Sequence, residues 1–114
     1  MEKKPINREE YIQKVLGAYR QTPGTAGTIR RPDRLLAAEL YTRSVPLCAV
    51  ENAFVLAASR RLIRPVGAAP LTTIRSLAYF SPVIEEVLAS RVSPGYYEYL
   101  RNKIQRFLQP SNAR

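Results

Sequence analysis

Arginine is the residue type in this sequence whose number and spacing point to a chemistry. The 114 residues include 18 Lys and Arg against 9 Asp and Glu, and 14 of the 18 cations are arginines, so the formal net charge is +9. A guanidinium group forms planar, paired hydrogen bonds with phosphate and with guanine, whereas a lysine ammonium acts as a point charge. A balance this basic, with a pI of about 10.2, is typical of domains that contact nucleic acid.

Many of these arginines bracket the stretch from Arg30 to Pro65, which we predict to form two helices over about 32–43 and 47–63. Pro46 ends the first helix and presets φ for the second. The apolar positions recur at three- and four-residue steps: Leu35, Leu36, Leu40 and Tyr41 in the first helix, and Leu47, Val50, Phe54 and Ala57 in the second. Two short helices joined by a tight turn have the shape of a helix-turn-helix. The turn glycine of that motif is absent, and Ser44 is the nearest substitute. The alternative is a helical hairpin that only packs a core.

In the helix-turn-helix interpretation, the helix after Pro46 reads DNA, and Asn52 could bind adenine through two hydrogen bonds. The positions expected to face DNA are Ala49, Glu51, Asn52 and Ser59. If the two helices are antiparallel, the arginines that open the first lie near those that close the second, where they would contact the phosphate backbone. The alternative is a solvated rim that Asp33 partly neutralises. The candidate nucleic-acid-binding residues are Arg30, Arg31, Arg34, Arg43, Asn52, Arg60, Arg61, Arg64, Arg101 and Lys103.

Enzyme chemistry lacks its usual residues in this chain. There is no histidine, and the one cysteine, Cys48, can form neither a cysteine–histidine dyad nor an internal disulfide. Glu85 and Glu86 are neighbours on a predicted helix and point about 100° apart, so the two carboxylates do not converge on one atom for acid–base catalysis. We interpret them as surface charges that lie near the positive end of the helix dipole. No residues have the spacing of metal ligands. We therefore predict a non-enzymatic protein without metal or cofactor, with Cys48 in the core.

Proline and glycine punctuate the rest of the chain and predict one compact all-α domain. The expected elements are a basic arm over 1–6, a helix over about 7–20 capped by Asn7, a linker over 21–29, the central pair, a helical stripe from Leu71 to Ala78, a helix with Ser81 as its N-cap, a last helix from Gly95 to about Leu108, and a tail over 110–114. We assign Tyr79 and Phe80 to the core. No segment alternates at period two, so we predict five to six helices over 7–109.

The chain also lacks membrane and export signals. No stretch approaches the roughly 18 apolar residues of a membrane span, and the start, MEKKPINREE, has no apolar region of a signal peptide. A lone cysteine fits a reducing compartment. We therefore expect a cytoplasmic protein with no membrane partner.

The run RSVPLCAVENAFVLAASRRLIRP, followed by PLTTIRSLAYFSPVIEEVL, resembles small basic accessory proteins of bacterial plasmids, phages and integrative elements. It is also similar to the helical tail domains of primosomal and phage replisome-organiser proteins. In those domains, a helix pair with an apolar core precedes a helix that helps bind single-stranded DNA or a helicase. The resemblance covers residues 34–88 and rests on spacing and a few apolar positions. It implies a role in DNA replication or mobile-element maintenance.

These observations predict a basic helical DNA-binding protein, with DNA favoured over RNA, that acts as an accessory factor of a mobile element. A homodimer would allow it to read two half-sites. The alternative is an adaptor that docks an acidic partner, such as a replicative helicase or a recombinase, in an apolar groove near Tyr96–Leu100. The sequence leaves open single strand or duplex, the recognition site and the oligomeric state.

Overall fold

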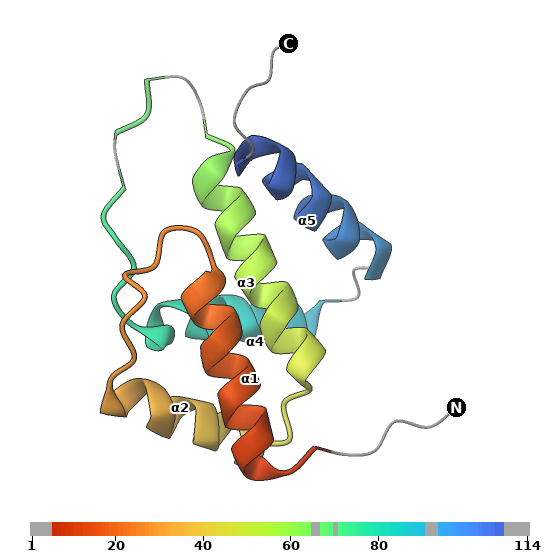
Figure 1. Ribbon diagram of the computed structural model, residues 1–114. Coiled ribbons are helices and arrows are strands. Elements are labelled where there is room, and N and C mark those ends of the chain that lie inside the picture. Colours follow the sequence, from red (N-terminus) through yellow and green to blue (C-terminus); the bar gives the residue numbers. More distant parts are fainter. Residues whose placement is uncertain (1–5, 65–66, 70, 91–93, 109–114) are drawn as a thin grey trace.

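The computed structural model describes residues 6–64, 67–69, 71–90 and 94–108, and these residues form an all-α domain (Figure 1). The elements are α1 (Arg8–Gln21), α2 (Arg31–Thr42), α3 (Leu47–Leu62), the 3₁₀ helix η1 (Leu77–Phe80), α4 (Ser81–Ala89) and α5 (Pro94–Leu108). The prediction of a compact all-α domain with five to six helices is confirmed. The C-terminal tail and nearly all of the N-terminal arm lie outside the described residues. None of the described helices is long and apolar enough to cross a membrane.

Local sequence signals set the starts of α1 and α2 and shape the turn before α3. The Asn7 side chain caps α1 by accepting a hydrogen bond of 2.7 Å from the Glu10 N–H, as predicted. Pro32 lies in the first turn of α2, where its missing N–H would have no intrahelical partner. Between α2 and α3, Ser44 has a φ of 63°. This is the left-handed conformation that a turn glycine would adopt at lower cost.

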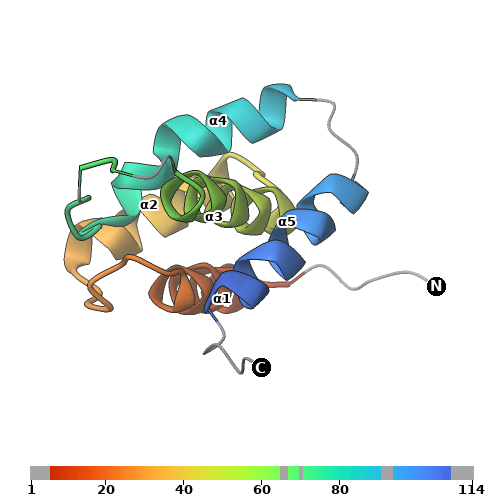
Figure 2. The ribbon, with the colours of Figure 1, turned by 90° about the horizontal axis from the view of Figure 1, so that it is seen from above.

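α3 is the central helix of the domain. α1, α4 and α5 all pack against it, and the view from above shows them on different sides of it (Figure 2). All four alanines of α3 are buried: Ala49, Ala53, Ala57 and Ala58. Short side chains allow neighbouring helix axes to approach closely, so this alanine-rich sequence suits a helix that is surrounded. Val50 and Phe54 fill the core as predicted.

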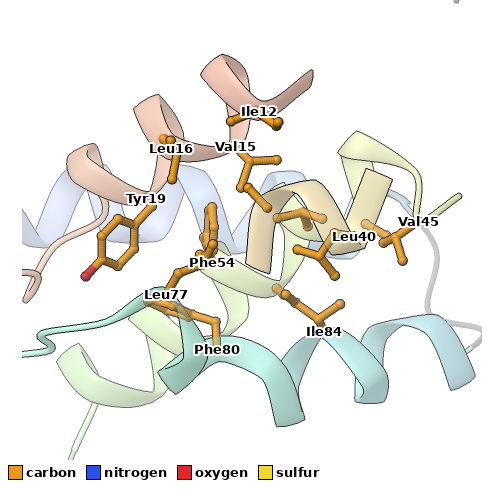
Figure 3. Close-up of a cluster of buried hydrophobic side chains, with 14 of the residues drawn as sticks. Ile12, Val15, Leu16, Tyr19, Leu40, Val45, Phe54, Leu77, Phe80 and Ile84 are labelled. Atoms are coloured by element: carbon orange, nitrogen blue, oxygen red, sulfur yellow. The ribbon is translucent and has the colours of Figure 1, made fainter. Parts of the chain in front are cut away.

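An aromatic cluster joins α1, α3 and η1 in the core (Figure 3). The ring of Phe80 lies edge-on to those of Phe54 and Tyr19, with centroid separations of 4.8 and 6.0 Å. Edge-to-face geometry places the positive edge of one ring against the negative face of another, which stabilises the pair beyond its buried area. Phe80 therefore occupies the core as predicted, and it fixes η1 against α3.

The helices of the central pair do not form an antiparallel hairpin. α2 packs on α1 and η1, and it runs across the lower end of α3 rather than back along it (Figure 1). The Tyr11 hydroxyl of α1 donates a hydrogen bond of 2.8 Å to the Val45 carbonyl and so anchors the turn between α2 and α3. Because α2 buries a narrow stripe containing Ala37 and Leu40, the predicted core residue Leu35 is 59% exposed.

The predicted helical stripe from Leu71 to Ala78 is wrong. Residues 71–76 form no helix: Ile74 forms a β-bridge, Ser76 has extended dihedrals, and η1 begins only at Leu77. The Ile74 N–H donates to the Gly24 carbonyl, and the Ile74 carbonyl accepts from the Ala26 N–H, both at 2.8 Å. These bonds form a parallel bridge to the loop that we predicted to be a linker. The β-branched run Thr-Thr-Ile favours this extended conformation.

Two local predictions at helix starts are also wrong. Ser81 is not an N-cap, because η1 runs directly into α4 and Ser81 is already the first residue of that helix. Cys48 is not in the core, because it lies on the exposed side of the first turn of α3. In both cases the neighbouring element determines the environment, and the local sequence does not.

The buried carboxylate of Asp33 joins α2 to η1. Asp33 is 2% exposed; its Oδ2 accepts from the Arg30 N–H and its Oδ1 accepts from the Leu77 N–H, both at 2.9 Å. Both N–H groups lie at helix starts, where no intrahelical acceptor exists. Hydrogen bonds to an ionised acceptor are stronger than neutral ones. Asp33 therefore supplies the hydrogen-bond acceptor for an N–H group at the start of α2 and for another at the start of η1, although Arg30 and Leu77 are far apart in the chain.

We expect Asp33→Ala to lower the free energy of unfolding by about 2–4 kcal/mol, because both N–H groups lose a charged acceptor. Asp33→Asn keeps one acceptor oxygen and should lose about half as much. Urea unfolding followed by circular dichroism measures both values. An unfolding midpoint for Asp33→Ala equal to that of the native chain would contradict this role.

Burial raises the pKa of Tyr11 from 10.0 to about 12. The folded protein therefore keeps a proton that the unfolded chain releases near pH 10, so this contribution to stability is complete below pH 10 and is lost as pH rises toward 12. We expect Tyr11→Phe to cost about 1 kcal/mol at neutral pH, because the hydrogen bond to Val45 is lost. Its stability should then fall less steeply than that of the native chain between pH 10 and 12. Thermal unfolding as a function of pH would detect the difference, and parallel curves would contradict it.

Candidate nucleic-acid interface

α3 cannot serve as the predicted reading helix, because it is covered by three other helices. Ala49 and Ser59, predicted to face DNA, are 7% and 5% exposed, and Glu51 and Asn52 are only half-buried. A recognition helix must present one whole face to the major groove. The surface that α3 leaves free is limited to its two ends and to a strip between α1 and α5.

Four arginines lie near the two hydrogen bonds of Asp33. Arg30, Arg31 and Arg34 are within three residues of Asp33 in sequence, and Arg75 is two residues before Leu77, to which Asp33 is bound. All four are exposed. The guanidinium groups of Arg31, Arg34 and Arg75 form no hydrogen bond or ion pair within the described part of the chain. Their donors are therefore open to a ligand. We call these four residues the α2 arginines.

Arg60, Arg61 and Arg64 line one pocket at the end of α3. Its volume is about 380 Å³, and its other lining residues are Ala57, Leu71, Tyr79 and Val83. Arg61 is held in place by the Thr72 carbonyl, at 2.7 Å from Nη2, and by the Tyr79 hydroxyl, at 3.3 Å from Nη1. Arg64 donates to the Ala69 carbonyl. We call this the arginine pocket.

Two of the candidate arginines are paired with glutamates of α4. Arg43 Nη1 lies 2.9 Å from Glu85 Oε2, and Arg60 binds both carboxylate oxygens of Glu86, at 2.9 and 2.5 Å. The hydrogen bonds from Arg60 hold the pKa of Glu86 below its ordinary value. The glutamates lie beyond the first turn of α4, so they do not favour the helix dipole as predicted. Exposed pairs contribute little stability, but they occupy donors that a ligand would need.

Arg101 and Lys103 lie apart from the other candidates. Both are on α5, which is on the opposite side of α3 from η1 (Figures 1 and 2). Lys103 Nζ is 5.7 Å from the centroid of the Tyr99 ring, which is within the range of a cation–π contact. The structure therefore does not bring the α5 cations together with the α2 arginines or the arginine pocket.

The predicted single cluster of six arginines is replaced by two groups that border η1. Asp33 connects the α2 arginines to Leu77, and Arg61 reaches Tyr79, two residues further on. Arg75 and Tyr79 were missed as site residues. Tyr79 was assigned to the core but is 45% exposed, because Phe80 takes the buried position. The β-branched run before Arg75 is the signal that could have revealed an extended segment there.

A groove crosses the face of α3 between α1 and α5. Its volume is about 770 Å³, and its lining includes Phe54, Val55, Ile104 and Leu108. Arg101 also lines it. The groove lies along the C-terminal half of α5, beyond the Tyr96–Leu100 region where we predicted one. A smaller pocket of about 390 Å³ includes Tyr96 and Tyr97.

Metal chemistry has no candidate ligands in the described part of the chain, where no group of three or more His, Cys, Asp or Glu is placed to hold an ion. No protein-family model, no curated protein and no solved structure matches this chain.

Gly24 allows the loop after α1 to pack under Arg61. Its φ is +94°, and a Cβ there would lie 3.0 Å from Arg61 Nε. We expect Gly24→Ala to cost about 1–2 kcal/mol of unfolding free energy, because the backbone becomes strained and Arg61 is displaced. Thermal unfolding measures this change.

Gly17→Ala is the matched control, because Gly17 is exposed within α1 and an added Cβ meets nothing within 4 Å. It should raise the unfolding free energy by roughly 0.5–1 kcal/mol. A Gly24→Ala protein as stable as Gly17→Ala would show that the loop is not tightly packed under Arg61.

Proposed function

We propose that this chain binds DNA through the arginines that border η1. The observation that carries the proposal is that Arg31, Arg34 and Arg75 are exposed and unpaired within the described residues, and that the Asp33–Leu77 hydrogen bond joins the two chain segments that carry them. The arginine pocket lies beside the same segment and extends the basic surface. Two of its three arginines form no ion pair with an acid of the described chain.

Electrostatics favour a polyanionic ligand for this surface. The chain carries a formal net charge of +9, and unpaired like charges held near one another repel until an anion neutralises them. DNA supplies phosphates at regular spacing, and cations that replace its condensed counterions gain affinity from counterion release. Guanidinium is the side-chain group that best matches phosphate geometry.

We propose contact with the phosphate backbone as the main mode of binding. Phosphate contacts position a protein on DNA and carry no direct sequence information, so the affinity should depend weakly on sequence. The burial of α3 supports this mode, because the helix that carries the predicted reading residues is packed by other helices and cannot present them to the bases. The preference for DNA over RNA, the homodimer, the cytoplasmic location and the role in replication or mobile-element maintenance stay predictions from the sequence.

Salt dependence tests the proposal. We expect a fluorescently labelled DNA strand to bind with an affinity that falls log-linearly between about 50 and 200 mM salt, with a slope near 0.7–0.9 per phosphate contact. The combined variant Arg31→Ala/Arg34→Ala/Arg75→Ala should lower that slope by roughly 2–3, because three contacts are lost. Fluorescence anisotropy measures both.

The matched control removes three cations from other exposed sites, as Arg8→Ala/Lys14→Ala/Arg106→Ala. Tyr11 lies against Val45, which places the start of α1 at the far end of α2 from the α2 arginines. The control should leave the slope nearly unchanged. Equal effects of the two triple variants would mean that net charge alone attracts DNA and that the α2 arginines do not form the interface.

We propose docking of a partner protein as the second candidate function, because the groove between α1 and α5 offers apolar surface. Leu108 is exposed at this groove, and Ile104 and Phe54 lie in its wall and floor. Grooves of this kind accept the apolar face of an amphipathic helix. The absence of any DNA binding near physiological salt would favour this function over the first.

A further inference from the structure

We infer that the arginine pocket holds one unstacked nucleotide of a single strand, with its base on Tyr79 and its phosphate on the arginines. The inference rests on the proposed DNA binding and names the form of DNA that the surface takes. It starts from the composition of the pocket, which combines three guanidinium groups with an exposed aromatic ring in a volume of about 380 Å³. That volume lies at the lower end of the range for small-ligand sites.

The ring of Tyr79 is exposed in the pocket and is held in place by its neighbours. It lines the pocket and is 45% exposed. Its position is fixed by an edge contact with the buried Phe80, at a centroid separation of 5.1 Å, and by Arg61, whose guanidinium carbon lies 5.7 Å from the Tyr79 centroid. A fixed aromatic ring loses little entropy when a base stacks on it. Exposed Leu71 and half-buried Val83 add apolar surface beside it.

The arginines of the pocket can bind the phosphate next to such a base. A guanidinium group has five N–H donors. Arg61 uses two of its nitrogens on Thr72 and Tyr79, and Arg64 uses one on Ala69. These contacts hold the side chains in place and leave further donors free. The site therefore pairs a preorganised cation with a stacking surface, which is the combination that single-strand binding proteins use.

A duplex cannot make the same contact. Its bases are stacked on one another, so their faces are covered, and extruding one costs a few kcal/mol of unpairing and unstacking. The helix predicted to read a duplex, α3, is covered by α1, α4 and α5 and cannot enter a groove. The pocket thus selects single strands, whereas the α2 arginines would contact the phosphates of either form.

Glu86 competes with the strand for Arg60. Its carboxylate binds both terminal nitrogens of Arg60, and Arg60 lines the arginine pocket. A phosphate in the pocket must share or displace this carboxylate. The ion pair therefore sets the affinity of the site, and removing the carboxylate should raise that affinity.

The test compares Tyr79→Ala and Tyr79→Phe on three labelled ligands of equal length: a single strand, a duplex, and an abasic single strand that keeps the phosphates but lacks bases. We expect Tyr79→Ala to weaken single-strand binding by roughly 5- to 150-fold and to leave duplex and abasic binding unchanged. Tyr79→Phe keeps the ring and should stay near the native affinity. Tyr99→Ala removes an exposed tyrosine on the far side of α3 and is the control.

A second pair of variants does not depend on Tyr79. Glu86→Gln and Glu85→Gln make the same charge change at adjacent positions of α4, but only the first frees an arginine of the pocket. We expect Glu86→Gln to tighten single-strand binding about 1.5- to 5-fold relative to Glu85→Gln. Equal affinities of the two variants would overturn the competition between Glu86 and the strand.

The outcomes separate the two proposals. Failure of the native protein to bind any of the three ligands near physiological salt removes the DNA-binding function and this inference together. Salt-dependent binding that treats strand and duplex alike, and that Tyr79→Ala does not change, keeps DNA binding and overturns the nucleotide pocket. Equal losses for Tyr79→Ala on the native and abasic strands also overturn it, because the base would then make no contribution.

Discussion

The two hydrogen bonds of the buried Asp33 carboxylate hold together parts of the domain that the sequence separates. They connect the start of α2 to Leu77, across 44 residues of chain. The β-bridge at Ile74 fixes the same segment three residues earlier. A segment anchored at both points has its backbone groups satisfied outside a helix, so it stays extended. This conformation places Ile74 and Leu77 in the core and leaves Arg75 in solvent.

The central position of α3 determines where a ligand can bind. A helix packed by three others can present only its ends and the strips between its neighbours. The predicted reading face of α3 is therefore covered, and the ligand surface that we propose lies around the C-terminal end of this helix. The ion pair from Arg60 to Glu86 connects the end of α3 to α4. The basic surface is therefore assembled from several elements around η1, and its geometry depends on the packing that fixes η1.

Local signals in the sequence predicted the helices well, and the site only in part. Asn7, Pro32 and Pro46 act on their own neighbours, so their effects are visible in the sequence. An alanine such as Ala49 is equally compatible with an exposed position and with a closely packed one. Only the packing of other helices determines which of the two environments it has. The exposure of Tyr79 depends on the Asp33 bond and on Phe80 taking the core. The spacing of apolar residues along the chain does not predict contacts between residues this far apart.

The most direct measurement is a titration of the ¹⁵N-labelled protein with a short single strand, followed by amide chemical-shift changes. We predict the largest changes at the start of α2, over residues 75–80 and at the C-terminal end of α3, with little change in the buried middle of α3. Changes concentrated along α5 and the groove, or no changes at near-physiological salt, would contradict the claim that the arginines bordering η1 form the ligand surface.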